Sequence, residues 1–348
     1  MKALFFILFS FFCLTSCKKK EIPTAENAVI ISERLSYKND GKQFVLKSGK
    51  FENSFNSSKL GFKKVVLLNS SLLGFFTELN LVDRIVGLSS PEYVFDENIR
   101  KAVASNKIAN IGNEQKYDVE RILSLKPDAI FTNYVPSFEN TYEILRKANI
   151  QIIFLDEYLE TTPLNKSKYL LLFGELFGVK DLAEQKYKSI ETGYQYLKQL
   201  ASKSAEKPVV LCNEMYGSQW FLPGGKSAAA NYFRDANANY ILAENAEINA
   251  IPLSFEEVYK KSENAKYWVN IGAYQTRQAM LNINPNYSKM KVFQNGKLYM
   301  INNREVGMAN DYFQSGAVRA DLVLKDYIKI FHPELFPKEN LYYLKELK

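Results

Sequence analysis

A stretch near the middle of the 348-residue chain, Thr162 to Ser202, carries the longest helical signal in the sequence. Thr162 and Pro163 read as an N-cap followed by a proline at the first helical position. Gly178 supplies a left-handed stop after Phe177. These signals predict one helix that begins at Pro163 and ends at Phe177.

A second and longer helix is predicted directly after it. Asp181 and Glu184 form an acidic variant of the capping box, and apolar residues then recur every three or four positions to about Ser202. The recurring residues are Leu182, Ala183, Tyr187, Ile190, Tyr194, Leu197 and Ala201. About twenty residues at 1.5 Å each reach about 30 Å, the diameter of a small domain. We therefore expect a rigid rod that joins two halves of the chain.

Strand-like and helix-like segments alternate on both sides of this rod. The clearest predicted strands are Val65 to Leu68, Ile85 to Leu88, Ala129 to Thr132, Gln151 to Leu155, Val209 to Cys212, Tyr267 to Val269 and Leu298 to Ile301. Such alternation favours a mostly parallel sheet covered on both faces, in which ligands bind at the carboxyl ends of the strands. The predicted fold class is α/β, with two Rossmann-like lobes joined by a single long backbone helix and a ligand cleft between the lobes.

The predicted domains follow from these elements. Residues 1–16 are a lipoprotein signal peptide, 17–61 an anchor tether and N-terminal hairpin, 62–161 an N-terminal α/β lobe, 162–206 the linker helices and 207–348 a C-terminal α/β lobe. The hairpin is predicted from β-type runs at Val29 to Leu35 and Gln43 to Lys47 around the turn Asn39-Asp40-Gly41. The Asn- and Ser-rich stretch Asn53 to Lys59 is expected to be a loop.

The first residues are typical of an export signal. Lys2 precedes the apolar run Ala3 to Leu14, which is shorter than the roughly 20 residues of a spanning helix. Leu14-Thr15-Ser16-Cys17 resembles a bacterial lipobox, in which Cys17 is lipid-modified; an ordinary signal peptide with a chance cysteine is the alternative. We expect an exported protein, lipid-anchored to a membrane and facing the periplasm.

Cysteine and charge usage exclude several classes of protein. Cys13 lies in the signal and Cys17 is the anchor, so Cys212 has no partner for an internal disulfide. The formal net charge of +7 is dispersed except at Lys18 to Lys20, a cluster that suits anionic lipid headgroups. No basic stripe with interleaved aromatic residues indicates nucleic-acid binding.

The sequence gives little support for catalysis. The single histidine, His332, leaves histidine-based triads and metal sites without a partner. Gly224-Gly225-Lys226-Ser227 lacks the first glycine of a phosphate loop, because Trp220 stands there, and is interpreted as a turn and helix cap. We expect no enzyme, no cofactor and no bound metal, although a carboxylate-dependent hydrolase with two converging acidic residues stays open.

A weak internal repeat links the two halves. Asp118 to Ile122 leads to a predicted strand, and Ser254 to Val258 does the same 136 residues later. Each copy has an N-cap and a glutamate two residues on, Glu120 or Glu256. These carboxylates either stabilise the helix dipole or form two matching anionic contacts, one on each lobe.

Polar and aromatic residues just past predicted strand ends are the candidates for the cleft. They are Asn69, Ser70, Tyr93, Asn113, Lys116, Tyr134 and Tyr158 in the first lobe, and Glu214, Tyr216, Trp220, Tyr274 and Arg304 in the second. Tyrosine occurs 22 times, so any one of these tyrosines can instead serve packing.

Four strings resemble the substrate-binding proteins of bacterial ABC importers for cobalamin and ferric siderophores, the class with one helical backbone between its lobes. They are KVVLLNSS at 64–71, LVDRIVGL at 81–88, VERILSLKPDAI at 119–130 and QNGKLY at 294–299. The resemblance implies little lobe motion and a glutamate on each lobe that docks onto the permease, at Glu120 and Glu256. The N-terminal hairpin is additional to that pattern.

The resulting hypothesis is a monomeric lipoprotein that captures a ferric siderophore, or a related iron chelate or corrinoid, between its lobes and delivers it to an ABC permease. Arg304 or Lys116 would pair with anionic groups of the ligand, and aromatic residues would hold its bulky parts. The alternative is a surface lipoprotein that binds glycans or chelates beside an outer-membrane receptor, without a permease.

Overall fold

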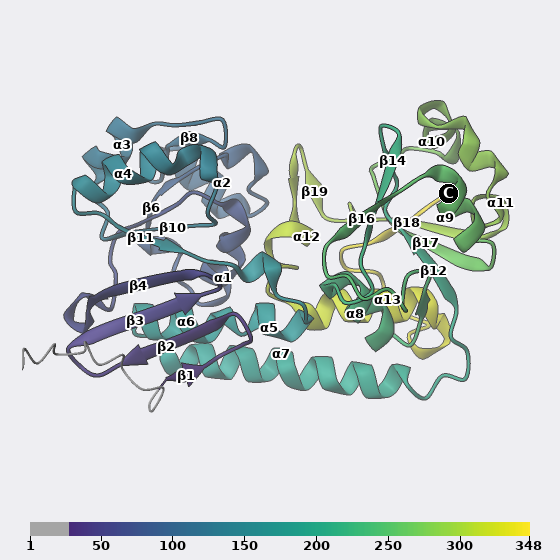
Figure 1. Ribbon diagram of the computed structural model, residues 1–348, viewed down its shortest axis with the longest axis horizontal. Coiled ribbons are helices and arrows are strands. Elements are labelled where there is room, and N and C mark those ends of the chain that lie inside the picture. Colours follow the sequence, from purple (N-terminus) through teal and green to yellow (C-terminus); the bar gives the residue numbers. More distant parts are fainter. Residues whose placement is uncertain (1–27) are drawn as a thin grey trace, which may run out of the picture.

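The computed structural model describes residues 28–348, which form two α/β lobes above one long helix and a small sheet beside the first lobe (Figure 1). The predicted signal peptide, which includes Cys13, and the predicted lipidation site Cys17 lie outside the described residues. Among the described residues, no helix combines the length and the apolar character that a membrane span needs.

The N-terminal lobe is built on a five-stranded parallel sheet of order β11-β10-β5-β6-β7. Its strands are β5 (Val65–Leu67), β6 (Ile85–Leu88), β7 (Ala109–Asn110), β10 (Ala129–Thr132) and β11 (Gln151–Phe154). Strands β5 and β10 are buried at every position, as expected for a parallel sheet covered on both faces. The other elements are α1 (Leu73–Glu78), α2 (Glu97–Ala104), α3 (Val119–Leu125), α4 (Glu139–Lys147) and the hairpin of β8 (Gly112–Asn113) and β9 (Lys116–Tyr117).

The C-terminal lobe has a second five-stranded sheet, of order β15-β12-β17-β18-β21, that is parallel except for β21. Its strands are β12 (Val209–Cys212), β15 (Asn239–Tyr240), β17 (Ala265–Ile271), β18 (Lys297–Met300) and β21 (Lys345–Leu347). Two small antiparallel sheets contain β13 (Met215–Tyr216), β14 (Gln219–Pro223) and β16 (Ala250–Leu253), and β19 (Glu305–Val306) with β20 (Ala309–Asn310). The helices are α8 (Ala228–Asp235), α9 (Phe255–Lys261), α10 (Arg277–Ile283), α11 (Lys291–Asn295), α12 (Asp311–Gln314) and α13 (Ala320–Phe331).

Helix α7 (Lys180–Ala201) runs below both lobes and packs against α6 (Tyr169–Phe177) and α13 (Figure 1). Six of its predicted apolar positions are buried: Ala183, Tyr187, Ile190, Tyr194, Leu197 and Ala201. Gly178 ends α6 in the left-handed conformation with φ of 72°, as predicted. The predicted rod therefore exists as one 22-residue helix.

Two details of the linker differ from the prediction. The helix expected from Pro163 to Phe177 is interrupted at Lys168 and forms α5 (Pro163–Ser167) and α6. Thr162 is the N-cap of α5 but makes no side-chain hydrogen bond there. Asp181 does not start a capping box on α7, because the N-cap of that helix is Val179. Burial of one helical face, rather than capping, specifies these helices.

The N-terminal segment is a sheet of four antiparallel strands and not a hairpin. Its strands are β1 (Val29–Ile30), β2 (Leu35–Asn39), β3 (Gln43–Ser48) and β4 (Phe51–Asn56), in that order. The loop predicted from Asn53 is wrong, because β4 buries Asn53 and Phe55 on the face that also carries the half-buried Phe51, while Glu52, Ser54 and Asn56 are exposed. The sheet is tied to the lobe by an ion pair from Arg34 to Asp156 at 2.8 Å.

The predicted repeat is present in both lobes. Asp118 caps α3 and Ser254 caps α9 through a full capping box with Glu257, and each helix leads to an inner strand of its sheet. Both α3 and α9 lie on the side of the molecule opposite α7 (Figure 1). Gly224 to Ser227 forms the predicted turn, in which Ser227 caps α8.

Candidate functional site

The part of the candidate site that belongs to the N-terminal lobe lies where the strand order of its sheet changes direction. After β5 the chain continues to β6 and β7 on one side, and then returns to β10 and β11 on the other. Asn69 follows β5 and Asn133 follows β10, and the side-chain Nδ2 of Asn69 donates to the side-chain Oδ1 of Asn133. A switch point of this kind leaves a crevice at the carboxyl ends of the strands.

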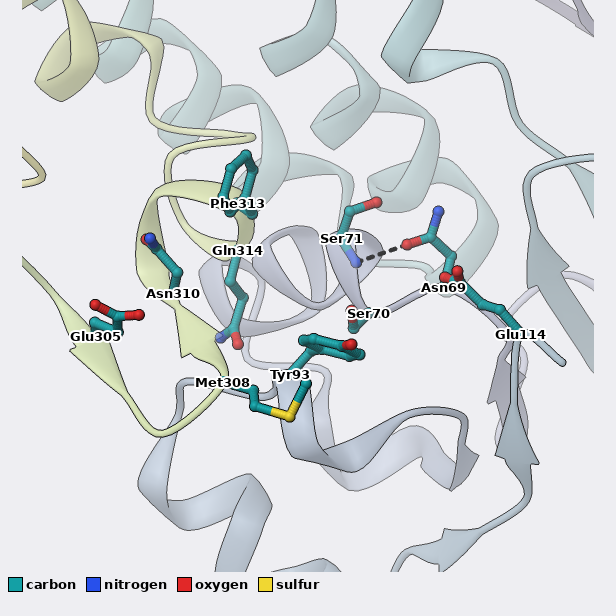
Figure 2. Close-up of a pocket in the computed structure, with 10 residues that line it drawn as sticks. All are labelled: Asn69, Ser70, Ser71, Tyr93, Glu114, Glu305, Met308, Asn310, Phe313 and Gln314. Atoms are coloured by element: carbon teal, nitrogen blue, oxygen red, sulfur yellow. Dashed lines mark hydrogen bonds between the residues drawn. The ribbon is translucent and has the colours of Figure 1, made fainter. Parts of the chain in front are cut away.

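A first pocket, here called the hairpin pocket, opens between the lobes beside the β19–β20 hairpin and has a volume of about 460 Å³. The N-terminal lobe contributes Asn69, Ser70, Ser71, Tyr93 and Glu114. The C-terminal lobe contributes Glu305, Met308, Asn310, Phe313 and Gln314 (Figure 2). The two lobes therefore share one pocket.

Apolar side chains from both lobes are exposed around the hairpin pocket. Tyr93 is 46% exposed, Phe313 is 57% exposed and Met308 is 61% exposed. The charged residues that line this pocket are two carboxylates, Glu114 and Glu305. Exposed apolar groups that converge from two lobes on one pocket indicate a binding surface for a bulky ligand.

A second pocket, here called the lysine pocket, adjoins the first and has a volume of about 490 Å³. Asn69, Ser71 and Phe313 line both pockets. The remaining lining residues are Asn133, Tyr158, Pro163, Lys166, Ala228, Ala229, Tyr232, Tyr312, Gly316, Ala317 and Val323. Lys166 supplies the charged group of this mainly apolar lining.

Glu157, a buried carboxylate, lies close to the lysine pocket. It is 1% exposed and accepts hydrogen bonds from Asn133 Nδ2 at 2.9 Å and Ser71 Oγ at 3.4 Å. Burial raises the pKa of Glu157, although the charge of Lys166 opposes this effect. Burial also lowers the pKa of Lys166, with Glu157 acting in the opposite direction.

Direct contacts join the two lobes to each other and join the linker helix α5 to the second lobe. Phe95 N donates to Gln314 Oε1 at 2.8 Å, and Ser167 Oγ donates to Val318 O at 2.6 Å. Gly74 allows α1 to approach α12, because a Cβ at this position would lie 2.3 Å from Gln314 O. The lobes therefore touch each other in addition to sharing α7.

Four of the predicted cleft residues come together in these pockets: Asn69, Ser70, Tyr93 and Tyr158. Asn113 and Lys116 pair across the β8–β9 hairpin, and it is Glu114 between them that lines the hairpin pocket. Tyr134 packs against Phe51, with ring centroids 5.1 Å apart, and lines neither pocket.

The predicted residues of the second lobe lie elsewhere. Glu214 accepts a hydrogen bond from Tyr274 OH at 2.7 Å, and Tyr216 is 83% exposed, but none of the three lines either pocket. Trp220 cannot contact a cleft ligand, because its side chain is completely buried. Arg304 Nε donates to Asp311 at 2.6 Å, so its charge already has a partner.

Several pocket residues were not predicted from the sequence: Glu114, Asn133, Lys166, Tyr232, Glu305, Met308, Asn310, Phe313 and Gln314. Asn133 had a usable signal, since it follows a predicted strand directly. The β19–β20 hairpin turns at Gly307 with φ of 61°, but its two-residue strands are too short for a periodic pattern.

Two observations concern a metal site and a histidine-based catalytic site. Within residues 28–348 no three His, Cys, Asp or Glu side chains cluster as metal ligands. His332 is buried, and its Nε2 lies 3.0 Å from the Ala236 carbonyl, which is a structural contact.

Comparisons with known proteins agree with this architecture. The family model described as periplasmic binding protein matches residues 65–305. A relative described as an uncharacterized lipoprotein of Methanocaldococcus jannaschii is 22% identical over 328 residues, covering 88% of this chain and 76% of the relative.

Solved structures show the same fold at low sequence identity. A periplasmic binding protein from Veillonella parvula is 17% identical with a TM-score of 0.65, over 85% of this chain and 99% of that one. Helicobacter pylori CeuE with Ni(II) bound is 17% identical with a TM-score of 0.63, over 85% and 91%. A periplasmic heme binding protein from Pseudomonas aeruginosa is 16% identical with a TM-score of 0.61, over 82% and 98%.

Proposed function

The chain belongs to the periplasmic binding protein family of ABC importers, and on this premise we propose that it captures an iron chelate between its lobes and delivers it to a permease. The hairpin pocket is the observation that carries the proposal. Tyr93 from one lobe and Met308 and Phe313 from the other expose apolar surface to the same pocket.

The chemistry of the two pockets suits a chelate better than a bare ion. Together they offer aromatic and apolar surface with a few polar groups, and the described residues hold no cluster of metal ligands. A chelate presents an organic shell to the protein and needs no ligand set from it. A ferric siderophore, a corrinoid and heme all have this property, and we propose a ferric siderophore.

Delivery is proposed to use Glu120 and Glu256. Both carboxylates are exposed, lie in the first turns of α3 and α9 and form no ion pair with another described residue. The two helices lie on the same side of the molecule, opposite α7 (Figure 1). One free carboxylate on each lobe suits docking to a permease whose surface presents cations.

Ligand capture can be tested by calorimetric titration of the full-length protein in detergent solution. The probes are ferric citrate, ferric enterobactin, ferrichrome, hemin and cyanocobalamin. We expect saturable 1:1 binding of at least one iron chelate, with a Kd in the micromolar range or below.

A matched pair of variants assigns the binding to the cleft. Met308→Ala with Phe313→Ala removes two exposed apolar groups from the pocket and should weaken binding about tenfold or more. Tyr196→Ala with Ile283→Ala also removes two exposed groups, at positions outside both pockets, and should leave the Kd unchanged. Failure of every probe to bind, or equal affinity of the two double variants, contradicts the proposal.

A further inference from the structure

The lysine pocket contains two polar groups that the described residues leave without a hydrogen-bond partner. Lys166 and Tyr232 both line the pocket, and neither the Lys166 ammonium nor the Tyr232 hydroxyl has a hydrogen bond or ion pair with another residue of the range 28–348. Helices α5 and α8, which carry them, pack against each other. Buried and half-buried polar groups normally have partners, so these two are available to a ligand.

Lys166 is placed in the pocket by the linker and not by a loop. It lies on α5 one residue before Ser167, whose hydroxyl is anchored to the Val318 carbonyl at 2.6 Å. Asn231 on α8 donates to the Thr161 carbonyl at 2.6 Å, just before α5 begins. These two contacts fix α5 against the C-terminal lobe, so the position of Lys166 is defined before a ligand arrives.

The charges near the two pockets differ in sign. The hairpin pocket is lined by the carboxylates Glu114 and Glu305, whereas the lysine pocket is lined by Lys166. Glu157 is a buried carboxylate whose charge acts on Lys166, and its oxygens already accept hydrogen bonds from Asn133 and Ser71. An anionic group would be repelled at the hairpin pocket and attracted by Lys166.

The remaining lining of the lysine pocket specifies what surrounds the anionic group. Ala228, Ala229 and Ala317 leave space, and Tyr232 and Tyr312 present ring surface. Burial raises the pKa of Tyr232 well above its ordinary value, so its hydroxyl keeps its proton and can donate it in a hydrogen bond.

We infer that the lysine pocket is a subsite for an anionic oxygen group of the ligand, a carboxylate or a catecholate on an apolar or aromatic body, which Lys166 and Tyr232 bind together. This inference rests on the proposed function, since it names the class of chelate that the cleft takes. It also replaces Arg304 and Lys116 as the cationic partner, because Arg304 is paired with Asp311 and Lys116 lines neither pocket.

The test compares variants of the full-length protein by calorimetry with ferric citrate and ferric enterobactin, which are anionic, and ferrichrome, which is uncharged. Lys166→Met should weaken binding of the anionic chelates about tenfold or more, the effect expected for loss of a charge-assisted hydrogen bond. Lys166→Arg should retain most of the affinity. Binding of ferrichrome, where it occurs, should change less than twofold in either variant.

A second variant separates charge from folding. Glu157→Gln removes the nearby carboxylate and should bind the anionic chelates at least as tightly as the unmodified protein, and thermal melting followed by circular dichroism checks that each variant is folded. The inference is overturned if folded Lys166→Met binds the anionic chelates normally, or if ferrichrome alone binds the unmodified protein. The proposed function itself fails if the unmodified protein binds none of the iron chelates.

Discussion

Trp220 and Trp268 pack against each other in a tilted arrangement inside the C-terminal lobe, with ring centroids 5.3 Å apart. Trp220 Nε1 donates to the Cys212 carbonyl at 3.1 Å, and Tyr287 packs against both indoles. Both tryptophans, the two that the chain contains, therefore serve the core and not the cleft.

Replacing Trp220 tests this assignment. Trp220→Ala should lower the free energy of unfolding by about 3–5 kcal/mol, because it leaves a large cavity and an unpaired carbonyl. Urea unfolding followed by far-ultraviolet circular dichroism measures this loss. The Kd of the folded variant for any chelate should equal that of the unmodified protein. A variant of normal stability that binds more weakly would show instead that Trp220 contacts the ligand.

At the scale of elements, periodic patterns predicted the long helix and both lobes. The α7 positions buried in the structure were predicted from their spacing, and the repeat at Asp118 and Ser254 predicted matching helix and strand units. Buried periodicity is a strong local signal because one face of an element must remain apolar.

Short elements and contacts between distant segments could not be predicted in this way. Strand β4, with the sequence FENSFN, has four polar residues among its six, so its composition resembles a loop although Phe55 is buried. The pockets join residues as far apart as Asn69 and Phe313, and no local pattern states which segments meet there. The candidate site was therefore predicted only in part: Asn69, Ser70, Tyr93 and Tyr158, all from segments that follow strands of the first sheet, line the pockets, whereas no predicted residue of the second lobe does.

Helix α13 holds the C-terminal segment through one buried carboxylate. Asp326 accepts backbone hydrogen bonds from Tyr342 at 2.7 Å and Leu344 at 3.0 Å, and a further one from Tyr343. Burial raises the pKa of Asp326 to about 6, although these hydrogen bonds oppose the rise. The segment that they hold leads directly into β21, the edge strand of the second sheet.

The raised pKa fixes the sign of a pH effect. Because the folded-state pKa of Asp326 lies above the ordinary value of 3.8, its contribution to stability is complete below about pH 4 and is lost as the pH rises through about 6. Asp326→Asn has no such titration, so its destabilisation relative to the unmodified protein should be smaller at pH 7.5 than at pH 5, by about 1 kcal/mol. Urea unfolding at both pH values measures the difference, and an equal or larger destabilisation at pH 7.5 would show that the hydrogen bonds outweigh burial.

At the scale of the whole molecule, the lobes are joined in two ways. Helix α7 packs against α13 of the second lobe and pairs its Lys186 with Glu78 of the first lobe at 3.4 Å, and a direct contact connects Phe95 with Gln314. Arg319 adds an ion pair to Glu78 across the same junction at 3.6 Å. These links favour small lobe movements, and with them a nearly constant separation of Glu120 and Glu256, which the proposed docking of both lobes on one permease requires.

The most direct test of delivery is the rate of 55Fe-chelate uptake in cells that lack the native gene and express the unmodified protein or a charge-reversal variant at equal levels. Glu120→Lys with Glu256→Lys should reduce uptake at least about tenfold while calorimetry shows an unchanged Kd. The control Asp181→Lys with Glu184→Lys, which reverses two exposed carboxylates on α7 on the opposite side, should import normally. Normal uptake by the first double variant would contradict the account and leave a protein that binds its ligand without handing it to a permease through these two residues.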